Sequence, residues 1–167
     1  RDQGDVIDDP DEEDRIGNAA EDLHLPRDFL DEVHSLLERH RQLIFYGPPG
    51  TGKTYVARRL AEAIAPNEEQ RMLIQFHPST SYEDFIEGYR PVSTGSDDIV
   101  YKLVDGPLRI MADRAASDPL NRPHILIIDE INRANLAKVL GELLFLLEYR
   151  EAEIYPLYRS DEPFSLP

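Results

Sequence analysis

The stretch that most constrains this chain is the string LIFYGPPGTGKT at residues 43–54, an apolar run followed by a glycine-rich turn, a lysine and a threonine. A turn of this kind at the start of a helix points several backbone N–H groups into one concavity, where the helix dipole also favours anions. The spacing of Gly47, Gly52, Lys53 and Thr54 is that of a phosphate-binding P-loop. The string therefore predicts a strand, a phosphate-binding loop and a helix in direct succession.

Each residue type in this loop has a chemical reason to be there. Gly50 and Gly52 let the backbone approach phosphate oxygens without a Cβ in the way, and the two prolines before them stiffen the entry. We expect Lys53 to reach the β and γ phosphates and the Thr54 hydroxyl to ligate Mg²⁺. The predicted nucleotide-binding residues are Gly47, Pro48, Pro49, Gly50, Thr51, Gly52, Lys53, Thr54 and Tyr55.

A second motif lies at His124 to Asp129, which reads HILIID and is followed by Glu130. A continuous apolar run ended by acids is typical of a central parallel strand buried on both faces. In P-loop enzymes, an acid at the end of such a strand holds Mg²⁺, and a second carboxylate can deprotonate the attacking water. Asp129 and Glu130 fit these two roles. Two acids can also merely end a strand, but the P-loop upstream favours the catalytic interpretation.

The remaining apolar patterns complete an α/β fold of the P-loop NTPase class, with a parallel sheet and flanking helices. From Gln75 to Pro91 the sequence has no sustained periodicity and predicts a loop with one short helical turn. The other predicted elements are a helix over 25–40, strands at 43–46, 72–76 and 124–129, helices after the P-loop to Pro66, over 106–119 and over 134–147, a hairpin or exposed loop at 92–104, and an irregular end at 155–167.

Composition narrows the class of protein. With 167 residues and 41% hydrophobic content, the chain suits one globular domain. It has no cysteine, which excludes disulfides and thiolate zinc sites and favours a cytoplasmic setting over a secreted one. No stretch approaches the roughly 18 apolar residues of a membrane span. We therefore expect no membrane association.

Most of the net charge of −15 is concentrated near the start of the chain, where residues 1–22 hold ten acids against Arg1 and Arg15. Strong self-repulsion and few apolar residues predict that residues 1–24 are a disordered acidic linker. A site for a basic partner is the alternative. The rest of the chain has no lysine and arginine stripe, so direct DNA binding is not indicated.

Three strings together resemble the McrB family: FYGPPGTGKT at 45–54, QFHPSTSYEDFIEGYRP at 75–91 and IIDEINRAN at 127–135. Members of that family are AAA+ nucleotide-driven motors of restriction systems that attack methylcytosine-containing DNA, and they use GTP, which is unusual for AAA+ proteins. The resemblance covers about residues 25–167. It implies that Lys53 and Thr54 are the Walker A pair and that Asp129 and Glu130 are the Walker B pair. Asn132 and Arg133, which follow, become candidates for an inter-subunit or sensing role.

The resemblance also implies cofactors and partners. It predicts Mg²⁺ with ATP or GTP as substrate, a homo-oligomeric ring, commonly a hexamer, and a nuclease subunit of the McrC type, with DNA engaged only indirectly. On the same basis, Tyr82, Phe85 and Tyr89 are predicted to face a partner or the ring pore; aromatic side chains that tuck the loop onto the core are the alternative. Two other functions stay open: an ATP-driven remodelling protein of the dynein-related or MoxR kind, and a truncated product that turns nothing over.

A last expectation concerns strand order. The AAA+ sheet implied by the resemblance runs five, one, four, three, two, so the strand between 43–46 and 124–129 is not among residues 1–167. The sensor residue, the arginine finger and the helical lid are likewise expected elsewhere. We expect residues 1–167 alone, a partial AAA+ domain over 25–167, to be unstable and to hydrolyse no nucleotide measurably.

Overall fold

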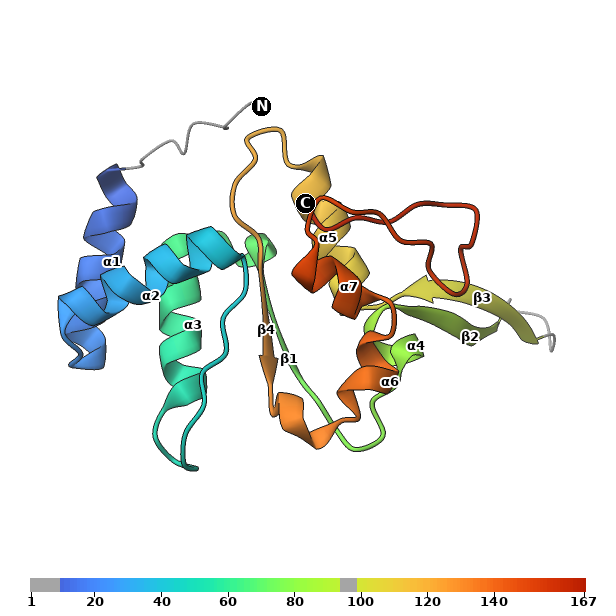
Figure 1. Cartoon of the computed structure of the whole chain (residues 1–167), viewed down its shortest axis with the longest axis horizontal. Coiled ribbons are helices and arrows are strands. Elements are labelled where there is room, and N and C mark those ends of the chain that lie inside the picture. Colours follow the sequence, from blue (N-terminus) through green and yellow to red (C-terminus); the bar gives the residue numbers. More distant parts are fainter. Residues whose placement is uncertain (1–9, 94–98) are drawn as a thin grey trace. The chain divides into compact units, whose positions relative to one another are not determined.

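The computed structural model describes residues 10–93 and 99–167. The chain divides into two compact units, residues 1–67 and residues 68–167, where the sequence favoured one globular domain. Each unit is described by itself (Figure 1). The first is helical, and the second holds the strands.

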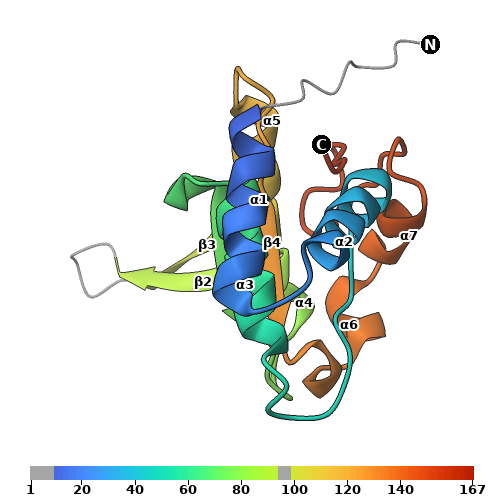
Figure 2. The ribbon, with the colours of Figure 1, turned by 90° about the vertical axis from the view of Figure 1, so that its left-hand side faces the viewer.

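The first unit contains three helices, α1 (Pro10–Leu23), α2 (Arg27–His40) and α3 (Lys53–Ile64). Helix α1 packs against both α2 and α3, and Figure 2 shows it alongside α3. The two predicted helices, over 25–40 and after the P-loop, are confirmed. Their shared core consists of Ile16, Ala19, Ala20, Leu30 and Ala63.

Helix α1 overturns part of the predicted acidic linker. Residues 10–23 are helical, so the prediction of disorder is wrong for them, while residues 1–9 lie outside the described residues. Ile16, Ala19 and Ala20, at helical spacing, are almost fully buried. Glu12 and Glu13 lie near the start of the helix, where the helix dipole favours negative charge. A short apolar stripe therefore outweighed the charge repulsion.

Polar contacts also fasten α1 to its neighbours. The Arg15 guanidinium donates from Nε to the Ala63 carbonyl at 2.8 Å, at the end of α3. Arg59 on α3 pairs with Asp22, and His34 on α2 lies 2.9 Å from Glu12. Arg59 has a raised pKa because it donates hydrogen bonds to Glu62 and Asp22.

The predicted strand at 43–46 is not formed. The segment is extended but belongs to no ladder, and the described strands pair only as β1 with β4 and β2 with β3. Ile44 is 71% exposed and Tyr46 is 93% exposed. A strand needs a partner for its backbone groups, and no described strand supplies one here. The sequence prediction is therefore wrong at this element.

The second unit is built on a parallel pair, β1 (Arg71–Gln75) and β4 (Ile125–Asp129), with Gln75 in register with Asp129. A short 3₁₀ turn, η1 (Glu68–Gln70), precedes β1, and helix α5 (Pro107–Ser117) packs on both strands. These predicted strands and the helix are confirmed within one or two residues. Strand β4, however, is only partly buried at every position, because its described ladder lies on one side only.

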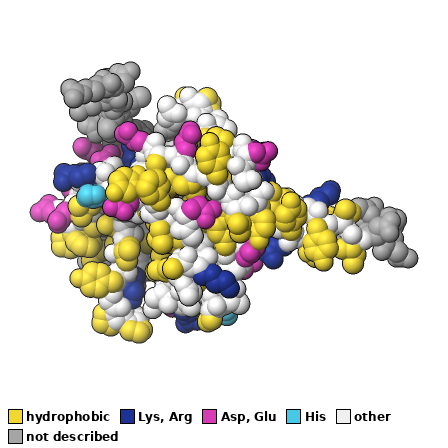
Figure 3. Space-filling view, turned by 45° about the vertical axis from the view of Figure 1, so that its right-hand side comes forward, with side chains coloured by type: hydrophobic (Ala, Val, Ile, Leu, Met, Phe, Trp, Pro, Cys, Tyr) yellow, Lys and Arg dark blue, Asp and Glu magenta, His cyan; other side chains and the backbone are white. Residues whose placement is uncertain are grey.

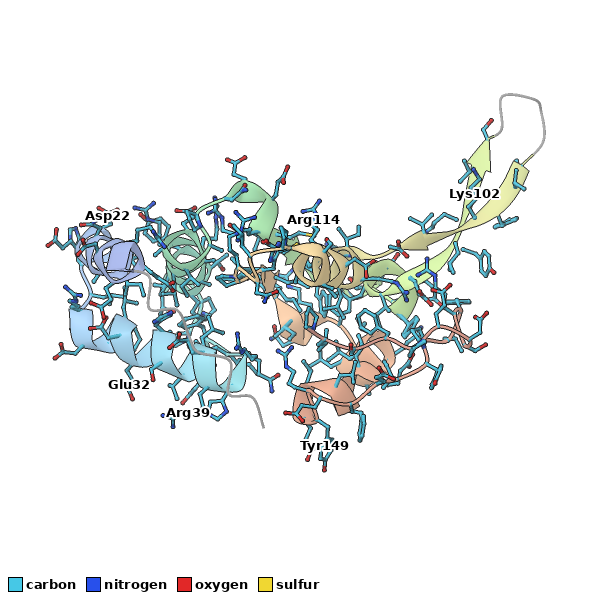
Figure 4. All side chains as sticks on the ribbon, turned by 90° about the horizontal axis from the view of Figure 1, so that it is seen from above. Asp22, Glu32, Arg39, Lys102, Arg114 and Tyr149 are labelled. Carbon is cyan, nitrogen blue, oxygen red and sulfur yellow. The ribbon has the colours of Figure 1, made fainter. Side chains whose placement is uncertain are left out.

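A β-hairpin projects from this unit. Strands β2 (Glu87–Ser93) and β3 (Ile99–Asp105) pair antiparallel, so the hairpin predicted at 92–104 is confirmed but its first strand begins earlier. It runs outward from the start of α5, with Lys102 on the outer part (Figures 1 and 4). Figure 3 shows hydrophobic side chains on this ribbon, and Tyr101 is 67% exposed.

The helix predicted over 134–147 is broken in two. After a 3₁₀ turn, η2 (Ile131–Arg133), come α6 (Leu136–Leu140) and α7 (Leu143–Glu148). Gly141 between them has φ 50° and ψ −127°, outside the helical region. The apolar pattern continued across the break, so hydrophobic spacing alone predicted one helix.

Two of the three aromatic residues expected to face a partner are core residues instead. Helix α4 (Tyr82–Phe85) buries Tyr82 and Phe85. The rings of Phe76 and Phe85 pack edge to face, with their centroids 5.2 Å apart. The Tyr82 hydroxyl donates to Glu142 at 2.7 Å, and burial together with this bond holds the pKa of Tyr82 well above its ordinary value. Tyr89 is 54% exposed and keeps its predicted role as a prediction.

Buried charges join the hairpin base to the irregular end of the chain, where one bridge pairs Ile154 with Phe164. Glu87 is fully buried and accepts from Arg109 at 2.9 Å and from Arg159. Arg159 also lies 2.6 Å from Asp105. Arg109 and Arg159 share the Glu87 carboxylate, and this pairing holds the end of the chain against the rest of the second unit.

Candidate nucleotide-binding site

The loop between residues 47 and 52 owes its shape to glycine. Gly47, Gly50 and Gly52 have φ values of 150°, 77° and 79°, a backbone region that side chains rarely adopt. Nothing lies within 4 Å of a Cβ built on Gly50 or Gly52, so backbone conformation, not crowding, requires glycine there. The Thr51 hydroxyl donates to the Pro48 carbonyl at 2.9 Å and closes the turn.

Lys53 is the first residue of α3, and its ammonium lies over the loop. Nζ donates to the Gly47 carbonyl at 3.0 Å and to the Pro48 carbonyl at 2.7 Å. The ammonium is thus held against the carbonyls at the start of the loop. A cation at this place supplies the charge that a phosphate chain needs.

The start of α3 completes an anion-binding arrangement. Gly52 caps this 12-residue helix, and the first backbone N–H groups of such a helix have no partner within it. Thr54 follows in the first turn, and Tyr55 is 56% exposed. Backbone donors, helix dipole and the Lys53 ammonium therefore converge on one end of the helix.

Asp129 and Glu130 lie at the carboxyl end of β4, as predicted. The Asp129 carbonyl accepts from the Phe76 N–H at 2.9 Å, which continues the ladder with β1, and its carboxylate accepts from the Glu130 N–H at 3.0 Å. Glu130 has φ 53° and ψ 37°, the left-handed region, which turns the chain sharply off the strand. The two carboxylates therefore occupy adjacent but differently oriented positions.

The two residues predicted for sensing follow in η2, and both are exposed. Arg133 donates from Nε to the Glu130 carboxylate at 3.1 Å, and its N–H donates to the Glu130 carbonyl at 2.9 Å. Asn132 lies between them in sequence. Arg133 therefore contacts the predicted base directly.

The predicted site residues fall in both units. Residues 47–55 belong to the first unit, and Asp129, Glu130, Asn132 and Arg133 belong to the second. Within each unit, the structure brings together the residues that the sequence grouped. Gln75, the last residue of β1, received no role from the sequence, because only the pairing of β1 with β4 brings it into register with Asp129.

Metal chemistry is limited to what the donors allow. Thr54 and Asp129 offer hydroxyl and carboxylate oxygens, the hard donors that Mg²⁺ prefers. Within residues 10–93 and 99–167, no group of three or more His, Cys, Asp or Glu side chains could hold a metal ion. Mg²⁺ needs no such cage, because it keeps several waters and binds through one or two protein groups together with phosphates.

The loop, the helix start and the paired acids at a strand end define a P-loop nucleotide-binding protein. The chain belongs to the AAA domain family, dynein-related subfamily, whose model matches residues 42–162. Among the helices that the structure describes, none is long and apolar enough to cross a membrane.

Curated relatives narrow this class. The chain is 42% identical over 136 residues to the type IV methyl-directed restriction enzyme EcoKMcrB subunit of Escherichia coli (strain K12), covering 80% of this chain and 28% of that protein. It is 32% identical over 130 residues to the type II restriction enzyme BsuMI component YdiS of Bacillus subtilis (strain 168), covering 65% of this chain and 38% of that protein. The human ATPase family AAA domain-containing protein 2 is 30% identical over 158 residues, and the match covers 72% of this chain and 11% of that protein.

The chain thus contains an AAA+ nucleotide-binding domain that is similar in sequence to the EcoKMcrB subunit. It spans 28% and 38% of the length of the two restriction relatives. The whole protein's activity therefore belongs with the proposals below.

Proposed function

We propose that this chain is the nucleotide-binding and hydrolysing core of a McrB-like AAA+ motor, which converts ATP or GTP to the diphosphate and phosphate. The observation that carries the proposal is the loop at residues 47–52, with its left-handed glycines and with Lys53 at the start of α3. A loop of this shape presents backbone N–H groups to phosphate oxygens.

On this proposal Lys53 exchanges its contacts with the loop carbonyls for contacts with the β and γ phosphates. The ammonium already lies within hydrogen-bonding distance of the Gly47 and Pro48 carbonyls, so little side-chain ordering remains to be done on binding. The remaining loop residues contribute backbone donors. We also propose that Tyr55, exposed in the first turn of α3, contacts the nucleotide beyond its phosphates.

Thr54 and Asp129 are the residues that would hold Mg²⁺, and their oxygen donors fit it. When bound, the ion neutralises charge that develops on the phosphates. Glu130 would accept the proton of the attacking water. Its carboxylate is held by Arg133 at 3.1 Å, so Arg133 is placed to set the position of the base. On this proposal Asn132, exposed in the same turn, has an inter-subunit or sensing role.

We further propose that the motor assembles as a homo-oligomeric ring and works with a nuclease subunit of the McrC type, with DNA engaged only through such partners. The similarity to a restriction-enzyme subunit supports this. Exposed Tyr89 on the hairpin is a candidate contact for that partner. A cytoplasmic location is consistent with these partners and is part of the proposal.

A second function is ATP-driven remodelling of another protein or complex. The match to the dynein-related AAA subfamily supports it equally, because that match does not distinguish restriction motors from remodelling motors. The two functions differ in nucleotide base and in cargo. The phosphate chemistry proposed for Lys53, Thr54, Asp129 and Glu130 is the same in both.

Nucleotide binding to the full-length protein tests the proposal. Calorimetric titrations with ATP and with GTP, each with and without Mg²⁺, are expected to show Mg²⁺-strengthened binding of at least one triphosphate. Preference for GTP would favour the McrB-like function, and preference for ATP the remodelling function. Absence of binding to both triphosphates would contradict the proposed function.

A further inference from the structure

The carboxyl edge of the β1–β4 pair carries a polar residue with no role so far. Gln75 is the last residue of β1 and is the register partner of Asp129, the last residue of β4. The ladder continues beyond this pair, because the Phe76 N–H donates to the Asp129 carbonyl at 2.9 Å. Both backbone positions are therefore fixed by hydrogen bonds.

Strand alternation places the two side chains on one face of the sheet. Phe76 is 1% exposed and belongs to the core of the second unit, where Ile74 and Ile128 also pack. Their neighbours Gln75 and Asp129 must then project from the opposite face. Adjacent strands lie about 4.8 Å apart, so in-register side chains start within reach of each other.

The chemistry of the pair is complementary. A glutamine amide has two N–H donors, and an ionised carboxylate only accepts. Asp129 already accepts from the Glu130 N–H at 3.0 Å on one side. A second donor from the neighbouring strand would fix the rotation of the carboxylate plane. Carboxylates that hold metals are commonly oriented in this way by a hydrogen-bonding neighbour.

We propose that Gln75 is a positioning residue for Mg²⁺ binding, acting through the Asp129 carboxylate. The inference rests on the proposed function, since it takes Asp129 as the magnesium-holding acid. Gln75 is exposed and makes no contribution to the apolar core. Its side chain can therefore be replaced without opening a cavity.

The test is a Mg²⁺ titration of nucleotide binding, read by the fluorescence of a labelled triphosphate on the full-length protein. Gln75→Met keeps length and flexibility but removes the amide. We expect it to raise the half-saturating Mg²⁺ concentration about ten-fold. Loss of a group that orients a metal ligand typically weakens metal affinity by about 10- to 100-fold, so this is the lower end of that range. Mn²⁺ binding measured by electron paramagnetic resonance should weaken in parallel, and turnover at saturating Mg²⁺ should stay near that of the wild type.

Two further variants separate the possible failures. Arg71→Met changes a long polar side chain on the same strand and face, four residues from the edge, and should leave the Mg²⁺ midpoint unchanged. Asp129→Asn should itself raise the midpoint, and adding Gln75→Met to it should have no further effect. If Asp129→Asn shifts the midpoint but Gln75→Met changes it less than about two-fold, the inference is wrong and the proposed function stands. If Asp129→Asn shifts nothing, both are wrong.

Discussion

At the scale of single residues, the account depends on Lys53 and Glu130. Each is held by a neighbour in its own segment: Lys53 by the carbonyls of the P-loop and Glu130 by Arg133. The first contact keeps a cation at the phosphate-binding loop. The second keeps the base oriented at the strand end. Their substitution should therefore separate binding from chemistry.

Replacing Lys53 by alanine should abolish triphosphate binding in the full-length protein. The change removes the cation that the loop offers to the β and γ phosphates, while the glycine conformations remain. Calorimetry should show at least a hundred-fold weaker affinity, about 3 kcal/mol. Arg58→Ala, an exposed change on the same helix, is the control and should bind as the wild type does. Unchanged affinity in Lys53→Ala would show that Lys53 is not the phosphate-binding cation.

Replacing Glu130 by glutamine should preserve binding but stop hydrolysis. Glutamine keeps the size and the ability to accept from Arg133, yet it cannot take a proton from water. Turnover should fall by about 100-fold or more, with triphosphate retained on the protein, as measured by chromatography of the bound nucleotide. Glu148→Gln on α7 is the matched control. Wild-type turnover in Glu130→Gln would show that another group is the base.

The sequence was a sufficient guide to these residues because the motif dictates local geometry. Fixed glycine spacing requires the left-handed turns that the structure has, and an apolar strand followed by acids places Asp129 at a sheet edge. Gln75 was missed because its role depends on its register with Asp129, a residue 54 positions further along the chain. No local sequence pattern reveals such a pairing. The buried Glu87–Arg109–Arg159 contacts were missed for the same reason.

At the scale of elements, the break between α6 and α7 shows where periodicity is insufficient. Leucines recur at helical spacing across it, but Gly141 takes a conformation that only glycine adopts easily. The opposite error occurred at α1, where the high density of acidic residues predicts disorder although a short apolar stripe allows a packed helix. In both cases tertiary packing decided the outcome: Gly141 lies against the Tyr82 ring, and α1 lies against α2 and α3.

Substituting Gly141 with alanine should destabilise the full-length protein by about 1–3 kcal/mol, because the backbone conformation becomes strained. A Cβ there would also lie 3.4 Å from the Tyr82 ring. Gly17→Ala is the control: Gly17 sits inside α1, and a Cβ would meet only the mobile end of Arg27 at 3.3 Å. Thermal unfolding should show a lower Tm for Gly141→Ala alone. Equal Tm values for the two variants would mean that Gly141 has no special backbone role.

At the scale of the whole molecule, the chain holds the motifs of a motor in two compact units. The apolar segment 43–46 leads into the P-loop, yet no described strand pairs with it, and Ile44 and Tyr46 are exposed. Each large apolar side chain left exposed in this way forgoes about 1.5–3 kcal/mol of burial free energy, against a typical domain stability of about 5–15 kcal/mol. The apolar character of residues 43–46 predicts a strand, but it carries no information about whether a neighbouring strand is present to pair with it.

Residues 1–167 produced by themselves should therefore lack a cooperative thermal transition and show no measurable Mg²⁺-dependent hydrolysis. Weak affinity for phosphate is still expected from the loop at 47–52. Circular dichroism melting and a phosphate-release assay on this segment check the two statements. A sharp transition together with turnover would show that the unpaired segment does not limit the domain.

Phosphate release by the full-length protein tests the central claim most directly. ATP and GTP are supplied separately, each with Mg²⁺ and with a chelator in its place, and released phosphate is followed over time. The account predicts steady release from at least one of the two triphosphates with Mg²⁺ and none with the chelator. Tight binding of a triphosphate with no phosphate released from either, or release that continues without a divalent ion, would contradict it.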